Sequence, residues 1–122
     1  MLFLRAFLAL VYFDLLLMRG NFDALYGKVR RHPVRSSGPH SKTAEEICTA
    51  VDSVSIWYWK QVLCLQRSAA TVCLLRRYGV AAQMVIGAQQ IPFRAHAWVE
   101  VDGQVVNDKP YMREMYGVLD RC

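Results

Sequence analysis

The chain has 122 residues, of which 54% are hydrophobic and 20% charged, and this composition excludes an intrinsically disordered protein. Its length suits one domain with a single modest core. The net charge is +5, but the basic residues are scattered in pairs, and without a basic stripe or a nucleic-acid motif we interpret them as solvated surface, not as a nucleic-acid-binding face.

An apolar run opens the chain at residues 1–18. Arg5 and Asp14 interrupt the run, it is barely long enough to cross a membrane, and no small-x-small cleavage site follows it, so neither a transmembrane helix nor a signal peptide is favoured. Apolar residues recur at helical spacing: Leu4, Phe7, Leu8, Val11, Leu15 and Met18. The run therefore predicts a helix that docks by this face, with peripheral membrane contact as the less favoured alternative.

Breaker residues divide the next part of the chain. Gly20-Asn21 ends the first helix, and a short second helix is predicted over residues 23–31. Residues 32–41 contain two prolines, a glycine and three serines, which predict a loop and a boundary between a helical N-terminal portion (1–41) and the rest (42–122). A third helix begins at Thr43, which forms a capping-box pattern with Glu46.

A further helix is predicted from Leu63 to Tyr78, with Gly79 as its C-cap. Cys64 falls in the first turn of this helix, where the helix dipole and the unpaired N–H groups stabilise a thiolate and can hold an oxyanion. Cys73 lies on the opposite side of the same helix, and like Cys48 it is interpreted as a small buried hydrophobe.

The four cysteines match no zinc-site spacing, and a chain of this size and apolar content does not require disulfides. We therefore predict reduced thiols in a cytoplasmic protein, with no structural metal. Nothing resembles a nucleotide-binding loop, so no bound cofactor is expected.

The last third of the chain predicts strands. Residues 80–88 read as a buried strand, 89–93 as a loop, 95–108 as a hairpin and 116–119 as a short closing segment. Helices followed by at least three strands indicate an α+β domain.

The hairpin carries a histidine on one arm and an aspartate on the other. A three-residue turn at Val101-Asp102-Gly103 pairs His96 with Asp108, close enough for an imidazole N–H to reach a carboxylate. A two-residue turn at Asp102-Gly103 would instead oppose His96 to Lys109 and put Asp108 on the other face. A thiol nucleophile needs a base, and the base needs an orienting acceptor, so the three-residue turn would complete a set with Cys64.

The segment from Cys64 to Asp108 resembles the transglutaminase-like peptidases of lasso-peptide biosynthesis. The resemblance rests on CLQRS at the start of the helix, RRYG at its end, a strand ending in Ile-Gly, a Pro-Phe loop and HAWVEVDGQVVND. It implies a transglutaminase-like or papain-like cysteine peptidase core, with Cys64 as nucleophile, His96 as general base and then acid, and Asp108 as the group that orients His96. The backbone N–H of Cys64 would supply one oxyanion donor, and Gln61, Trp57 or Trp59 are guesses for the second.

The resemblance also implies a function and partners. The enzyme would remove the leader from a ribosomally made precursor peptide, before an asparagine-synthetase-like enzyme closes the macrolactam. Some members carry a leader-recognition domain at the N-terminus, and this chain is expected to lack it and to work with a small leader-recognition protein.

Two other functions stay open. An acyltransferase or transglutaminase on the same fold would share the thioester chemistry but pass the acyl group to an amine instead of water. A non-catalytic peptide-binding module would use the cysteine, histidine and aspartate structurally.

Overall fold

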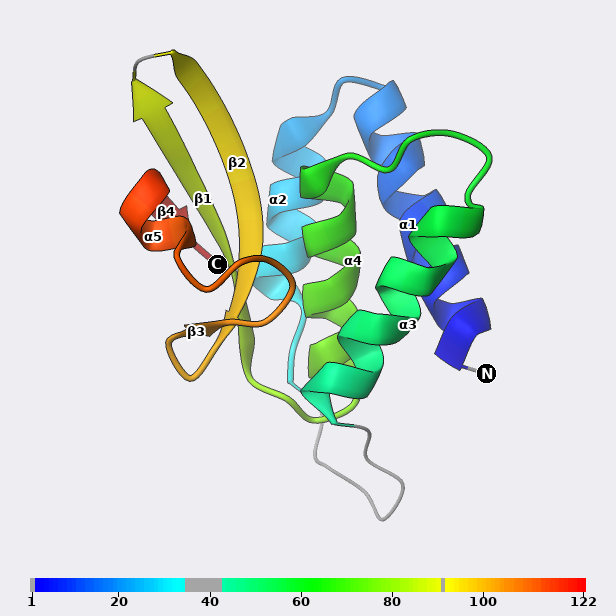
Figure 1. Ribbon diagram of the computed structural model, residues 1–122. Coiled ribbons are helices and arrows are strands. Elements are labelled where there is room, and N and C mark those ends of the chain that lie inside the picture. Colours follow the sequence, from blue (N-terminus) through cyan, green and yellow to red (C-terminus); the bar gives the residue numbers. More distant parts are fainter. Residues whose placement is uncertain (1, 35–42, 91) are drawn as a thin grey trace.

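The structure is a computed structural model that describes residues 2–34, 43–90 and 92–122. Its elements in chain order are α1 (Leu2–Met18), α2 (Phe22–Arg31), α3 (Ala44–Trp57), α4 (Cys64–Arg77), β1 (Ala82–Gln90), β2 (Phe93–Val101), β3 (Gln104–Val105), α5 (Met112–Met115) and β4 (Gly117–Arg121). The four long helices lie on one side and the sheet on the other, with α4 against the sheet (Figure 1). The predicted α+β class is confirmed.

The sheet is antiparallel with strand order β3-β2-β1-β4. The predicted loop over residues 89–93 was wrong, because β1 continues to Gln90 and β2 begins at Phe93; residue 91 itself lies outside the described residues. The closing segment was predicted only as a short piece, and it forms β4, which pairs along β1. A pairing partner that is far away in sequence leaves no local signal.

The helix α4 is the centre of the fold. Its residues Ala69, Val72 and Leu75 are fully buried, as their spacing predicts. Arg76, expected only to complement the helix dipole, is buried as well. Its guanidinium donates to Ala82 O at 3.0 Å, to His32 O at 3.2 Å and to the carbonyl of Val29, so one side chain links α2, α4 and β1.

The predicted docking face of α1 was wrong, although the helix itself forms. Leu4, Leu8, Leu15 and Met18 are exposed, and the buried residues are Ala6, Leu10, Phe13 and Asp14. A helix that is apolar nearly all round gives no periodicity to choose a face. The face of α1 that packs against the protein is the one that carries Asp14. This side chain is buried and accepts from Tyr58 Oη at 2.8 Å and Lys60 Nζ at 2.7 Å.

Within the described residues, no helix combines the length and the apolar character that crossing a membrane requires. The predicted loop over residues 32–41 lies outside the described residues from position 35 onward.

The hairpin turn also differs from the prediction. Glu100 pairs with Val105 and Val101 with Gln104, so the turn holds two residues, Asp102 and Gly103, and not three. Both have positive φ, +53° and +78°, which is the conformation of the tight turn that matches strand twist. The alternative with a two-residue turn is therefore the observed one, yet its expected consequence for Asp108 does not follow, as the site shows.

The glycine of β1 opposite His96 is tightly enclosed. A Cβ at Gly87 would lie 2.7 Å from Trp98 Cη2 and 2.9 Å from Tyr116 Cβ. We expect Gly87→Ala to lower the free energy of unfolding by about 1–3 kcal/mol, since a methyl group must displace packed rings. Urea denaturation measures this. Gly117→Ala is the matched control, because its Cβ would meet only Ala88 O at 3.7 Å, and equal losses in both variants would contradict the packing argument.

Candidate active site

His96 and Asp108 form a close pair at the outer edge of the sheet. His96 Nε2 lies 2.6 Å from Asp108 Oδ2, and both side chains are mostly buried. The imidazole also stacks on Tyr116, with ring centroids 5.4 Å apart, and lies 6.2 Å from the Trp98 ring. These contacts fix the ring plane and leave Nδ1 as the nitrogen not bonded to Asp108.

Asn107 explains how the pair forms in spite of the two-residue turn. The strand ladder ends where Val106 N–H donates to Val99 O at 3.0 Å. In a regular strand pair the Val99 N–H would donate to a backbone carbonyl, but here it donates to the side chain of Asn107, at 2.7 Å from Oδ1. The backbone of residues 106–108 bends out of the strand there, and Asp108 reaches His96 from the bend instead of from a paired position.

The same asparagine ties the bend to α4. Asn107 Nδ2 donates to Ser68 Oγ at 3.2 Å, and Ser68 Oγ donates to Ala97 O at 3.1 Å. Ser68 and Asn107 are both buried. Neither was singled out in the sequence, where Asn beside Asp reads as an ordinary turn pair, so this anchor of the site was missed.

The carboxyl of Asp108 is held ionised by its neighbours. Burial alone would raise its pKa, but the hydrogen bonds from His96 and Lys109 N–H and the charges of His96 and Arg67 outweigh burial and lower it. A lowered folded-state pKa means that Asp108 stabilises the fold above its unfolded pKa, and that this contribution is lost as pH falls through the folded value.

Cys64 is the first residue of α4, and its position along the direction of β2 can be compared with that of the His96–Asp108 pair. Ser68 contacts Ala97 on β2, and further along Arg76 contacts Ala82, the partner of Val101, so α4 and β2 run in the same direction (Figure 1). Four residues back from Ser68 are about 6 Å of helix, equal to about two residues of strand. Cys64 therefore lies level with residues 95–96, although no described residue hydrogen-bonds its thiol.

The other three cysteines differ from Cys64 in their surroundings. Burial raises the pKa of Cys48 and of Cys73 to about 11, and burial also raises the pKa of Cys122. Cys64 alone is in the first turn of a helix, where free backbone N–H groups can hold an oxyanion. All four are free thiols.

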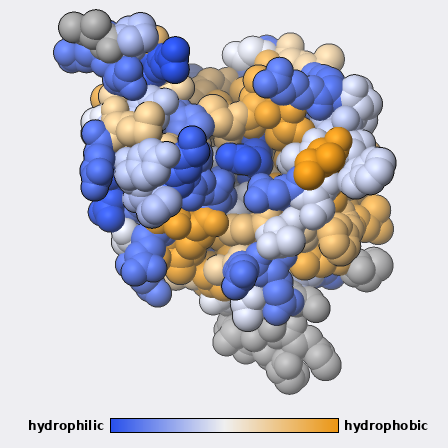
Figure 2. All heavy atoms as spheres, in the orientation of Figure 1, coloured by the Kyte–Doolittle hydropathy of each residue, from blue (hydrophilic) through white to orange (hydrophobic). Residues whose placement is uncertain are grey.

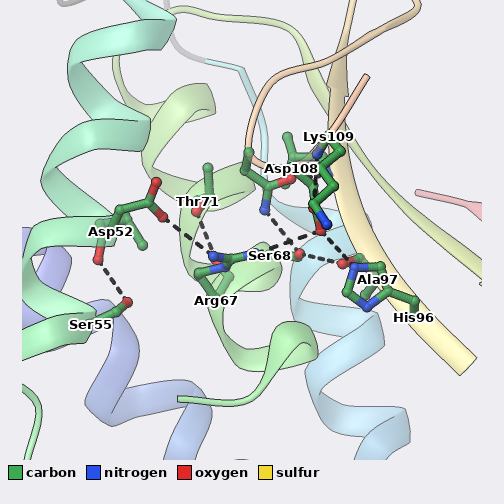
Figure 3. A network of polar contacts seen from close by, with 12 residues as sticks. Asp52, Ser55, Arg67, Ser68, Thr71, His96, Ala97, Asp108 and Lys109 are labelled. Atoms are coloured by element: carbon green, nitrogen blue, oxygen red, sulfur yellow. Dashed lines mark hydrogen bonds and ion pairs between the residues drawn. The ribbon is translucent and has the colours of Figure 1, made fainter. Parts of the chain in front are cut away.

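Arg67 extends the pair into a charged chain that runs from α3 to β2. Its guanidinium lies 3.8 Å from Asp108 Oδ2 and 3.6 Å from Asp52 Oδ1, and Figure 3 shows it between the two carboxylates. The pKa of Asp52 is raised, by burial first and also by repulsion from Asp108, against the attraction of Arg67. In the sequence Arg67 was noted only as part of the CLQRS segment, because its bridging position depends on contacts with residues far away in the chain.

This geometry predicts opposite titration shifts in two variants. Arg67→Met should raise the pKa of Asp108, because a cation that favours the carboxylate is removed. Asp52→Asn should lower the pKa of Asp108, because a repelling anion is removed and Arg67 loses its competing partner. Carbon-detected NMR titration of the Asp108 carboxyl measures both, and shifts in the same direction would contradict the bridging arrangement.

The three residues considered as the second oxyanion donor lie in different parts of the structure. Trp59 stacks on Tyr58 at 4.1 Å and its ring is 6.1 Å from Phe7, so it packs toward α1, while Trp57 is almost fully exposed. Gln61 lines a hollow of about 410 Å³ with Asp52, Ser55, Ile56, Val62 and Arg67. Figure 2 shows hydrophilic side chains in the recessed middle of this face.

Residues 7–121 match the transglutaminase-like superfamily. Over 56 residues, 46% of this chain, the sequence is 45% identical to "Microcin J25-processing protein McjB" of Escherichia coli, and the matched part covers 27% of that relative. No solved structure matches the chain. With a helix-initial cysteine, a histidine–aspartate pair on the sheet edge and a match over most of its length, the chain belongs to the transglutaminase-like superfamily.

Proposed function

We propose that the protein is a cysteine peptidase that cleaves the leader from a ribosomally made lasso-peptide precursor. The observation that carries the proposal is the 2.6 Å contact of His96 with Asp108, beside the helix that begins at Cys64. The similarity to a microcin-processing protein supports the substrate class, although the match covers about a quarter of that relative.

Cys64, His96 and Asp108 are assigned the three roles of the reaction. With Nε2–H bonded to Asp108, Nδ1 of His96 accepts the thiol proton as the sulfur of Cys64 attacks the scissile carbonyl. The C=O π bond opens to an oxyanion, which the N–H of Cys64 at the α4 N-terminus stabilises. Asp108 keeps the imidazole in the required tautomer and stabilises the imidazolium.

Two further steps complete the turnover. The imidazolium gives its proton to the departing amine as the C–N bond breaks, which leaves a thioester on Cys64 and releases the core peptide. Water then attacks the thioester with His96 as base, and the leader leaves with a new carboxylate while the thiol is restored. No cofactor is assigned.

The partners and the compartment are part of the same proposal. We assign the precursor as substrate and a small leader-recognition protein as the partner that presents it, upstream of an asparagine-synthetase-like macrolactam synthetase. Four free thiols support a reducing compartment, so we place the reaction in the cytoplasm.

Intact-mass analysis tests the function. The purified protein is incubated with a candidate precursor and the leader-recognition protein. We expect two products whose masses add up to that of the precursor plus one water. A product mass that contains an added amine would support acyl transfer instead, and an unchanged precursor that remains bound would support a peptide-binding module.

A further inference from the structure

The outer edge of β2 presents its backbone groups in a regular pattern. Val99 directs both its N–H and its C=O away from β1, toward Asn107 and Val106. Ala97 directs its C=O to the same side, where it accepts from Ser68. Because the hydrogen-bonding direction alternates along a strand, Ala95 presents its N–H and C=O to this edge as well.

The first half of this edge, at the start of β2, has no strand paired with it among the described residues. β3 pairs with β2 only at Glu100 and Val101, and on the side of β2 away from β1 no described strand pairs with residues 93–98. Ala95 is exposed, whereas residues 97–100 are buried. The segment that holds Asn107 and Asp108 covers the second half of the edge, so the open part stops at the histidine–aspartate pair.

The open edge faces the proposed reaction centre. Ala95 is the residue before His96, and it lies at the level of Cys64, the first residue of α4. A strand added to an edge lies about 4.8 Å from its neighbour. A peptide backbone hydrogen-bonded to Ala95 would therefore pass between the start of α4 and the imidazole.

We propose that the outer edge of β2 at Ala95 binds the substrate as an added β-strand, next to the scissile bond. This proposal rests on the proposed peptidase function. The occupant is an extended, non-proline peptide segment, recognised by its N–H and C=O groups. Phe93, the exposed first residue of β2, would contact a side chain of the bound strand.

A proline at position 95 tests the edge on the protein side. The Ala95 N–H points away from β1, so Ala95→Pro removes no ladder bond and should leave the melting temperature within about 2 °C. It removes one donor to the substrate and obstructs the added strand, so we expect kcat/KM for the precursor to fall by about tenfold or more. Ala95→Val, of similar volume but with its N–H kept, should lose several-fold less.

N-methyl groups test the edge on the substrate side. Precursors methylated at one backbone nitrogen at a time near the cleavage site should lose activity at alternate positions, since a bound strand faces its neighbour with every second residue. Uniform tolerance of methylation, equal losses in the Pro and Val variants, or full activity of Ala95→Pro would each overturn the proposal.

The experiment distinguishes a failure of the edge proposal from a failure of the proposed peptidase function. If wild-type protein cleaves the precursor and Ala95→Pro does so equally well, the edge proposal fails and the function stands. If wild-type protein does not cleave, the function fails first. Alkylation of Cys64 by iodoacetamide should proceed at the wild-type rate in Ala95→Pro, which shows that the nucleophile itself is unchanged.

Discussion

Replacing Cys64 with alanine is expected to abolish cleavage of the precursor, with kcat/KM at least about 10³-fold below wild type. In the proposed mechanism the thiol forms the covalent intermediate, and no other side chain at the start of α4 can replace it. His96→Ala should cost a similar factor. The double variant should be no worse than either single one, because residues that act as one unit are not additive. Product formation followed by intact mass measures each rate.

The matched control lies on the same helix. Cys73 is nine residues further along α4, is buried, and has a pKa raised to about 11, so it stays a thiol at neutral pH. Cys73→Ala should keep near wild-type activity. Full processing by Cys64→Ala, or an equal loss in Cys73→Ala, would refute the assigned nucleophile.

Glu100→Ala is expected to give the largest loss of stability, about 3 kcal/mol. The carboxylate is 2% exposed, accepts from Trp98 Nε1 at 2.9 Å and pairs with Arg121 at 2.5 Å. Its removal leaves a buried indole N–H without its acceptor and a half-buried guanidinium without its partner. Urea denaturation measures the change in the free energy of unfolding. Glu114→Ala, an exposed glutamate on α5, is the control and should change it by less than about 0.5 kcal/mol.

The pH dependence adds a second readout for Glu100. Burial alone would raise the pKa of this carboxyl, but Trp98 and the charges of Arg121 and Arg113 outweigh burial and lower it. The stabilisation is therefore present above the unfolded pKa and is lost as pH falls through the folded pKa. Wild type should lose stability on acidification in this range more steeply than Glu100→Gln. Identical slopes in the two proteins would contradict the ion-pair account.

The sequence predicted the contact between His96 and Asp108 but not the way it forms. The Asp-Gly dipeptide and the alternating valines predicted a hairpin correctly, since these signals are local. The turn length was wrong, and a regular continuation of the observed register would have separated the two side chains. The contact depends on the Asn107 amide taking a backbone position, which no propensity encodes.

The choice of Cys64 had a different basis. Its position in the first turn of a predicted helix made Cys64 the candidate among the four cysteines, and the resemblance then implied that it is the nucleophile. The structure adds that α4, which begins at Cys64, packs against β2, the strand that carries His96. The division of the chain at residue 41 remains a proposal. The docking face of α1 and the pairing of β4 depend on contacts with distant residues, Tyr58 with Asp14 and Met84 with Cys122, and could not be predicted from local pattern.

The placement of the pair within one hairpin has a consequence for the order in which a new chain assembles. Twelve residues separate His96 from Asp108, and closing so short a loop belongs to the fast local events of folding. In the proposed site, Cys64 joins them only when α4 docks through the Ser68–Ala97 contact, which spans 29 residues of chain. We therefore expect the acid–base pair to form first and the nucleophile to arrive last, so that a chain still folding holds no assembled reaction centre.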